Sequence, residues 1–385
     1  MFFLVLCFLV AMVPPFLIAR ERRARMPGQH VLPVLPRHPL PPAIAPVRGR
    51  PVVLPVPLAE SSSSSEKPQP EEPQPVEPQF HPSPGDIKLV REMLCEWTTI
   101  PVDVVDEILD YAEYWAHSSN EIDFNLEHGS HLKISGTSPS KNKFLLRSYP
   151  VGLTNPDGQK HLADELAYDT TEARPWPLTT PHQDTYFNKL ADYQAPPLEA
   201  PVRKVVFTIK SKDQGWGGRG QDHGTYQGSH TWFEAGLEKF DAADTCDPQC
   251  VYDVRFRSTE TVDPPLPVCT LRPILPPLEK SENPEVEFQC SHPLHGEPNV
   301  VIQHNVMAGK NMKEHVVTWS WLDDISPDSP EAESLAQQGR GKATGDGSFV
   351  RNLRMGDVIT VWGKARFPGW MNHVEKVKID IYWAV

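Results

Sequence analysis

The sequence predicts a mainly β protein, an antiparallel β-sandwich or jelly roll, preceded by a short helical pair and a disordered Pro-rich N-terminal arm. Three observations predict this fold class. Prolines crowd the first 85 residues, which hold 19 of the 42 in the chain. Apolar residues recur at helical spacing between residues 86 and 118, and with a period of two after about residue 143.

Residues 1–25 form an apolar segment for which three interpretations stay open. Residues 2–18 are almost wholly apolar, but a proline pair interrupts them and four arginines follow. A membrane helix needs about 20 apolar residues, and a signal peptide carries its positive charge before the apolar run. The segment is therefore a membrane anchor, a cleaved signal, or an extension upstream of a true start at Met26. We expect a cytoplasmic protein if Met26 is the start, and a secretory or membrane protein otherwise.

Residues 26–85 predict a disordered Pro-rich linker. Proline alternates with Val, Leu and Arg, and five serines from Ser61 to Ser65 lead into a Glu/Pro/Gln stretch. Proline fixes φ and removes a backbone donor, so such a stretch builds no packed core.

Residues 86–118 predict a helical pair. Asp86 is the expected cap of the first helix, in which Ile87, Leu94 and Trp97 recur at helical spacing. The second helix is expected from Pro101 to about residue 117, with Pro101 in its first turn. Two helices of this length bury little apolar surface, so they must dock on the following domain or on a partner.

Residues 140–385 predict the β-sandwich domain. The last expected strand shows the pattern best, because Val377, Ile379 and Ile381 alternate with charged residues. Short strands separated by Pro/Gly loops indicate antiparallel pairing rather than alternating strands and helices. The expected strands are 144–151, 202–211, 224–233, 251–257, 299–308, 314–322, 358–365 and 374–384.

Charge excludes nucleic acid as a partner. The whole chain has a net charge of −13, and residues 86–385 alone carry 29 basic and 44 acidic side chains. Without a basic face, little energy is gained by releasing counterions from a phosphate backbone.

Two segments at strand ends are the candidate binding elements, residues 211–218 and 362–373. Each places a tryptophan beside glycines and polar side chains. An indole can stack on a sugar or small polar ligand, and the polar side chains can hydrogen-bond it. An alternative is that the tryptophans close the ends of the sandwich. The candidate ligand-binding residues are Asp213, Gln214, Trp216, Trp370 and Asn372.

The runs from Ser211 to Trp216, from Gly228 to Phe233 and from Trp362 to Asn372 resemble a family of uncharacterised fungal proteins that carry these elements in the same order. The resemblance covers roughly residues 87–385. It implies a domain that begins near residue 87, and it implies no activity, substrate or cofactor.

Residues 100–109 resemble the opening helix of an F-box, in which a Pro-led amphipathic helix packs on a ubiquitin-ligase scaffold. The match lasts about ten residues, and the later F-box helices are not recognisable after Trp115. The resemblance implies an adaptor that binds a scaffold protein, and the alternative is a helix that packs on the sandwich.

The enzyme hypothesis rests on His182, Asp184 and His230. Two histidines and one carboxylate resemble the iron ligands of the non-haem iron, 2-oxoglutarate-dependent dioxygenases. The fold of that family, a double-stranded β-helix, is also mainly β. That family has an arginine soon after the second histidine, whereas the first arginine after His230 is Arg255. The alternative is that these are ordinary polar residues of loops.

Cysteine spacing gives a second and less complete pattern of metal ligands. Cys246, Cys250, Cys269 and Cys290 are enough for two disulfides across loops. Cys246 and Cys250, with Cys290 and His292, invite a zinc interpretation, but no second closely spaced cysteine pair completes the set. We expect free thiols in loops, with no metal and no cofactor.

The predicted function is a non-enzymatic binding module for a carbohydrate or protein partner, which contacts a membrane only if residues 1–25 are retained.

Overall fold

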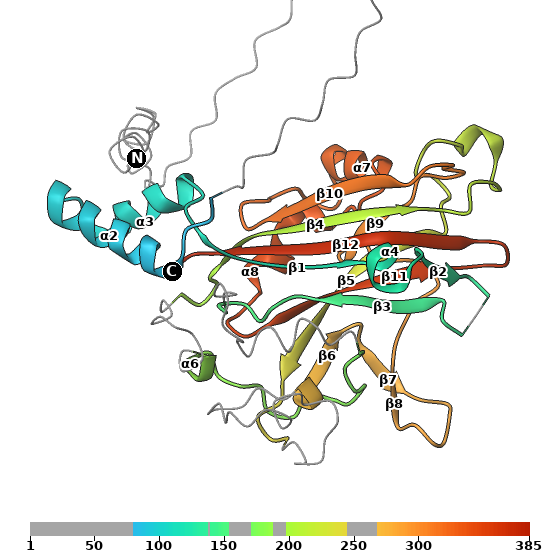
Figure 1. The fold of residues 1–385 in the computed structure, drawn as a ribbon, viewed down its shortest axis with the longest axis horizontal. Helices are drawn as coiled ribbons and strands as arrows, with labels where there is room; N and C mark the ends of the chain where they lie inside the picture. Colours follow the sequence, from blue (N-terminus) through green and yellow to red (C-terminus); the bar gives the residue numbers. More distant parts are fainter. Residues whose placement is uncertain (1–79, 138, 154–170, 188–197, 245–267) are drawn as a thin grey trace, which may run out of the picture. The chain divides into compact units, whose positions relative to one another are not determined.

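The computed structural model describes residues 80–137, 139–153, 171–187, 198–244 and 268–385, and they contain two five-stranded antiparallel sheets (Figure 1). Sheet A has the order β1-β12-β4-β10, with β2 also paired to β12. Its strands are β1 (Ala116–Asp123), β2 (Leu132–Ser135), β4 (Val202–Lys212), β10 (Lys313–Ser320) and β12 (Met371–Trp383). The mainly β fold class with a preceding helical pair is therefore confirmed.

Sheet B has the order β3-β11-β5-β6, with β9 also paired to β5. Its strands are β3 (Asn142–Arg147), β5 (Thr231–Phe240), β6 (Leu271–Leu275), β9 (Val301–His304) and β11 (Val358–Ala365). A separate pair consists of β7 (Leu278–Lys280) and β8 (Phe288–Cys290).

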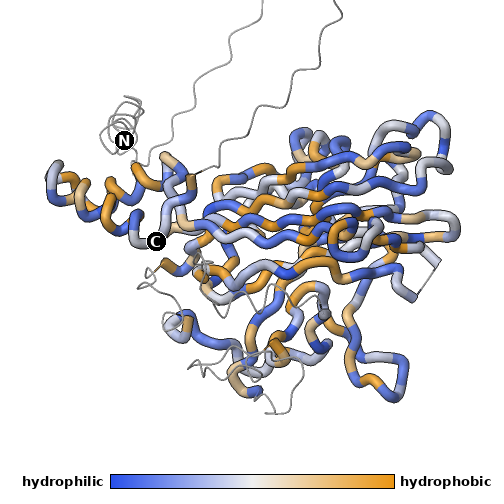
Figure 2. Tube along the Cα trace, viewed as in Figure 1, coloured by the Kyte–Doolittle hydropathy of each residue, from blue (hydrophilic) through white to orange (hydrophobic). Residues whose placement is uncertain are grey.

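The core lies between the two sheets. On β4, Val205, Phe207 and Ile209 are fully buried, while Val206 and Thr208 between them are half-buried. Figure 2 shows hydrophobic and hydrophilic residues interspersed along the strands. The sheets approach closely at Gly363 of β11, where a Cβ atom would lie 2.5 Å from Ile134 Cδ1 of sheet A. Glycine is required there because any side chain would force the layers apart.

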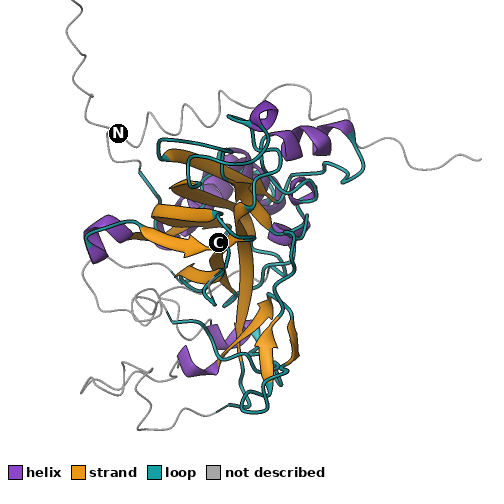
Figure 3. Cartoon of the chain, turned by 90° about the vertical axis from the view of Figure 1, so that its right-hand side faces the viewer, coloured by secondary structure: helices purple, strands orange, loops and turns teal. Residues whose placement is uncertain are grey.

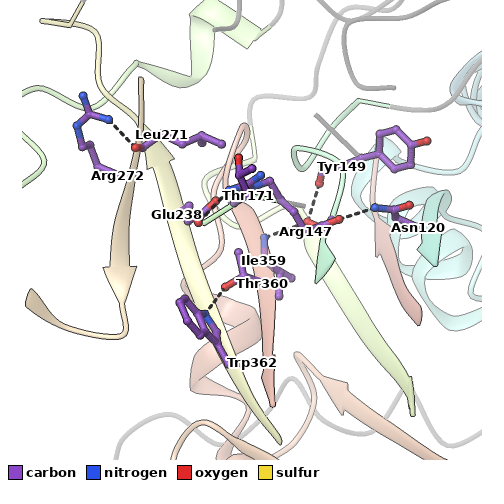
Figure 4. Close-up of polar contacts among 11 residues, drawn as sticks. Asn120, Arg147, Tyr149, Thr171, Glu238, Leu271, Arg272, Ile359, Thr360 and Trp362 are labelled. Atoms are coloured by element: carbon purple, nitrogen blue, oxygen red, sulfur yellow. Dashed lines mark hydrogen bonds and ion pairs between the residues drawn. The ribbon is translucent and has the colours of Figure 1, made fainter. Parts of the chain in front are cut away.

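The outer face of sheet B is also covered, since every residue of β11 is buried. This face carries charged side chains that pair with each other. Arg147 of β3 donates to Glu238 of β5, with Nε 2.6 Å from Oε2, and also donates to the carbonyl of Thr171 at 2.9 Å (Figure 4). A second buried pair joins Lys364 Nζ to Glu234 Oε2 at 3.3 Å.

The helical pair consists of α2 (Pro84–Thr98) and α3 (Val102–Tyr111). The cap of α2 is Ser83, so the prediction of Asp86 was wrong. Asp86 occupies the third helical position and completes a capping box, because its carboxylate accepts from the Ser83 amide while Ser83 Oγ accepts from the Asp86 amide.

The second helix ends six residues earlier than expected, and the chain then enters β1. Val105 and Leu109 of α3 are buried, whereas Val104 is exposed. The scaffold-binding hypothesis for this helix therefore stays a prediction.

The remaining described helices are α4 (Phe124–His128), α6 (Asp184–Phe187), α7 (Pro330–Gln337) and α8 (Ser348–Arg351), with 3₁₀ turns at Gly220–Asp222, Val268–Thr270 and Thr344–Asp346 (Figure 3).

Most expected strands match the structure, and β11 has the predicted bounds. The prediction for 224–233 was wrong over its first seven residues, because Gly224 and Gly228 have positive φ and hold this part in a loop before β5. The expected strand 251–257 lies outside the described residues. None of the described helices is long and apolar enough to cross a membrane.

Replacement of Glu238 by Ala is expected to destabilise the fold by about 3–5 kcal/mol, because it leaves the Arg147 guanidinium buried without its carboxylate. Urea unfolding followed by circular dichroism measures the change. The double variant Arg147→Met/Glu238→Leu is the control, and it should recover most of the loss. A single-variant loss below about 1 kcal/mol would show that the pair contributes little.

Candidate functional site

Four loops meet at one rim of the sandwich. They follow β4 (213–218), precede β5 (219–230), follow β9 (305–310) and connect β11 to β12 (366–370). Strand pairing places them together, because Ala365 at the end of β11 pairs with Thr231 at the start of β5, and Lys212 at the end of β4 pairs with His373 on β12.

A pocket of about 540 Å³ opens between these loops. Its apolar lining includes Met307 and Trp370. Its polar lining comes mainly from the loop before β5 and consists of Arg219, Gln221, Asp222, Gln227 and His230.

Glycines give the pocket its wall. Gly218 and Gly228 both have positive φ, which glycine adopts without strain. A Cβ atom on Gly218 would lie 2.4 Å from Met307 Sδ, and one on Gly228 would lie 3.0 Å from Met307 Cε. The loop after β4 and the loop before β5 therefore both pack directly against Met307.

Gln214 joins the two tryptophan-bearing loops. Its Nε2 donates to the carbonyl of Trp216 at 2.5 Å, and its Oε1 accepts from the amide of Met371 at 3.1 Å. The two loops singled out in the sequence are thus brought together, with Gln214 as a positioning residue.

Trp216 and Trp370 differ in their surroundings. Trp370 lines the pocket and contacts the His230 ring edge to face, with centroids 4.9 Å apart. Trp216 is 64% exposed and does not line the pocket, but its Cη2 lies 3.5 Å from where a Cβ of Gly369 would stand. The exposed indole thus adjoins the loop that carries Trp370.

Asp213 does not face the pocket. It is fully buried, and its carboxylate accepts from the amide of Gly215 at 2.8 Å and from the amide of Ala308 at 2.6 Å. Burial raises the pKa of this carboxyl, while the backbone donors oppose the rise. Asp213 therefore shapes the loops and is not available to a ligand.

Asn372 is also enclosed. Its Nδ2 donates to the carbonyls of Lys364 at 3.2 Å and Trp232 at 3.3 Å, and its Oδ1 accepts from Asn305 Nδ2 at 2.9 Å. These bonds tie β12 of sheet A to β5 and β11 of sheet B beneath the pocket. The expected ligand contacts of Asp213 and Asn372 are thereby replaced by structural roles.

The three residues of the iron hypothesis do not converge. The His182 amide donates to the carbonyl of Phe240 at the end of β5, whereas His230 precedes its start. A ten-residue strand spans about 30 Å, so the two imidazoles lie far apart. The described residues contain no group of three or more His, Cys, Asp or Glu that could hold a metal ion.

The residues of the zinc pattern are only partly described, since Cys246 and Cys250 lie outside the described ranges. Cys290 is a free thiol whose pKa is raised to about 12, first by burial and then by Glu172. His292 contacts Lys364 Nζ through Nδ1 at 2.5 Å. Burial and then Lys364 lower the pKa of His292 to about 3.

The polar groups of the pocket are available to a ligand. The side chains of Arg219, Gln221, Asp222 and Gln227 form no hydrogen bond or ion pair with other residues in the described part of the chain. The pKa of His230 is lowered, mainly by burial, so its imidazole is neutral at pH 7. The lining thus offers one guanidinium, one carboxylate and three neutral polar groups.

Sequence reasoning did not single out Arg219, Gln221, Asp222 or Gln227. The available signal is the glycine-rich stretch 215–224, which marks a loop but does not show which side chains point inward. Comparison of the chain with protein-family models, curated protein sequences and solved structures gives no significant match.

Replacement of Asn372 by Ala is expected to lower the free energy of unfolding by about 2–4 kcal/mol, since it removes three buried hydrogen bonds, to the carbonyls of Trp232 and Lys364 and to the Asn305 amide. Urea unfolding measures the loss. Trp370→Ala, two residues away, is the control, and it should lose less because Trp370 is only half-buried. Equal stability of the Asn372 variant and the unmodified chain would contradict the structural role.

His315 of β10 makes the stability of the loop before β5 depend on pH. Its Nε2 lies 3.1 Å from the hydroxyl of Tyr226, which also accepts from Lys313 Nζ at 2.8 Å. Burial, and then Lys313, lower the pKa of His315 to about 4 from an unfolded value of 6.5.

Between pH 6.5 and 4 the unfolded chain therefore binds a proton at His315 that the folded chain does not, and stability falls as pH falls. In His315→Gln, this slope should be smaller by up to about 1.4 kcal/mol per pH unit. Urea unfolding of both proteins from pH 7.5 to 4.5 tests this, and parallel curves would contradict it.

Proposed function

We propose that this chain is a non-enzymatic binding module that holds a carbohydrate or a similar small polar ligand in the rim pocket. The observation that carries the proposal is the meeting of two tryptophan-bearing loops at a pocket whose polar side chains are unpaired within the described residues. A pocket of about 540 Å³ also falls in the range of about 300–1,000 Å³ typical of small-molecule sites.

The chemistry of the lining suits a sugar. A sugar ring presents hydroxyls at its edge and C–H groups on its faces, and an indole covers such an apolar face. Arg219 donates hydrogen bonds, Asp222 accepts them, and the amides of Gln221 and Gln227 do both.

The charge of the lining favours a neutral ligand. Arg219 and Asp222 contribute opposite charges, and His230 is neutral at pH 7 because burial lowers its pKa. A phosphate or polyanion would gain from Arg219 but be repelled by Asp222, whereas a neutral polyol uses both groups.

The site is also preformed. Ala308 and Phe367, two non-glycine residues with positive φ (55° and 67°), flank the pocket. Such backbone costs about 1–3 kcal/mol per residue and persists only where the surroundings hold it. Asp213 holds Ala308 through its amide, and the Trp370 amide donates to the Phe367 carbonyl at 3.3 Å. A rigid site loses less entropy when a ligand binds.

Binding rather than turnover is favoured by the surroundings of His230. Its ring contacts the rings of Phe367 and Trp370, and no carboxylate among the described residues hydrogen-bonds it. A catalytic histidine is commonly oriented by a hydrogen bond to a carboxylate, and the described residues provide no such partner for His230.

Glycan-array screening of the purified chain, followed by calorimetry with the best glycan, tests the proposal. Trp370→Ala should weaken binding by tenfold or more, because it removes the stacking surface inside the pocket. Asp222→Asn should also weaken binding, since it removes a charged acceptor.

The control is Trp97→Ala, which removes another exposed indole from α2 and should leave glycan affinity unchanged. Absence of any glycan signal, or equal loss from the Trp97 and Trp370 variants, would reject the pocket as a sugar site.

A further inference from the structure

The helices α2 and α3 carry apolar side chains on their solvent side. Leu89 and Trp97 lie eight positions apart on α2, and Val104 and Tyr111 lie seven apart on α3, so each pair shares one face of its helix. These four side chains are between 42% and 66% exposed. We call them the outer stripe of the helical pair.

The outer stripe is not the surface that holds the helices to the rest of the protein. Ile87, Leu94, Val105 and Leu109 are buried and supply the internal packing. Each helix thus carries both buried and exposed apolar side chains, and only the buried ones have packing partners within the described residues. Exposed apolar groups gathered in this way mark an interaction surface.

The helices that carry the outer stripe are strongly acidic. The two helices hold seven acidic and two basic residues. Asp106 pairs with Arg91 at 2.6 Å, and Asp110 pairs with Arg203 at 2.9 Å. Four further carboxylates are exposed and pair with none of the described residues: Glu92, Glu96, Asp103 and Glu107.

This charge decides between possible occupants. A second copy would bring the same unpaired carboxylates against the first, and an anionic membrane would also be repelled. A segment that carries lysine or arginine beside its apolar anchors is attracted by the acidic residues and covered by the apolar ones.

We propose that the outer stripe of α2 and α3 docks a basic amphipathic segment of a partner protein. This inference is independent of ligand binding in the rim pocket, because Trp97 and Val104 belong to helices that precede the first strand of the sandwich.

Fluorescence polarisation with the full-length chain and labelled 18-residue peptides tests the proposal. One probe is a Leu/Lys peptide patterned as an amphipathic helix. The others are a Leu/Glu peptide with the same pattern and a Leu/Lys peptide of scrambled order. The patterned Leu/Lys peptide should bind at least tenfold more tightly than either comparison peptide, and its affinity should fall as salt rises from 50 to 500 mM.

Variants then locate the site. Trp97→Ala/Val104→Ala should weaken binding by tenfold or more, and Glu96→Gln/Glu107→Gln should weaken it and flatten its salt dependence. Leu126→Ala is the matched control, since Leu126 of α4 is 83% exposed but lies outside the helical pair. Circular dichroism confirms that each variant keeps its helices.

Equal binding of the three peptides, or full binding by Trp97→Ala/Val104→Ala, would overturn the proposal. Sedimentation that shows a dimer abolished by Trp97→Ala would assign the outer stripe to a second copy instead. Binding to phosphatidylserine vesicles that depends on Trp97 would assign it to a membrane.

Discussion

The connection from β11 to β12 is the constraint on which the rim depends. These strands occupy sheet B and sheet A respectively, so residues 366–370 must pass from one layer to the other. The backbone of this passage is held at several points: the Arg366 amide donates to the His230 carbonyl, and the Trp370 amide donates to the Phe367 carbonyl. Asn372 then fixes the start of β12 against β5 and β11 of the other layer. The position of Trp370, and with it the pocket, follows from how the chain makes this crossing.

The strands that sequence reasoning predicted well are those with one buried and one solvent-facing side. β4 and β12 alternate clearly, because only one of their faces packs on the core. β1 has no such pattern, since Ser118 and Asn120 are polar residues that point inward, and Asn120 Nδ2 donates to the Arg147 carbonyl of the opposite sheet at 2.6 Å. Asn120 stabilises this strand by a hydrogen bond across the layers, and periodicity does not detect such a bond.

The candidate site, like the strands, could be predicted from the sequence only in part. Its location could be predicted, because tryptophan and glycine gather at strand ends in the sequence. The role of each polar residue could not. Asp213 and Asn372 are as polar as Asp222, but they are buried because backbone amides and carbonyls from distant segments satisfy them. Whether a loop carboxylate is exposed or enclosed depends on tertiary hydrogen bonds that no local pattern contains.

The pairing of β12 has a consequence for how the protein folds during synthesis. β12 follows β1, β2 and β4 in the chain and is hydrogen-bonded to all three. Until the ribosome has released β12, these earlier strands have open edges and an uncovered apolar surface, which are the features that recruit chaperones and promote aggregation. A nascent chain stalled before residue 371 would therefore lack the common neighbour of three strands, and β1, β2 and β4 would stay unpaired on that side.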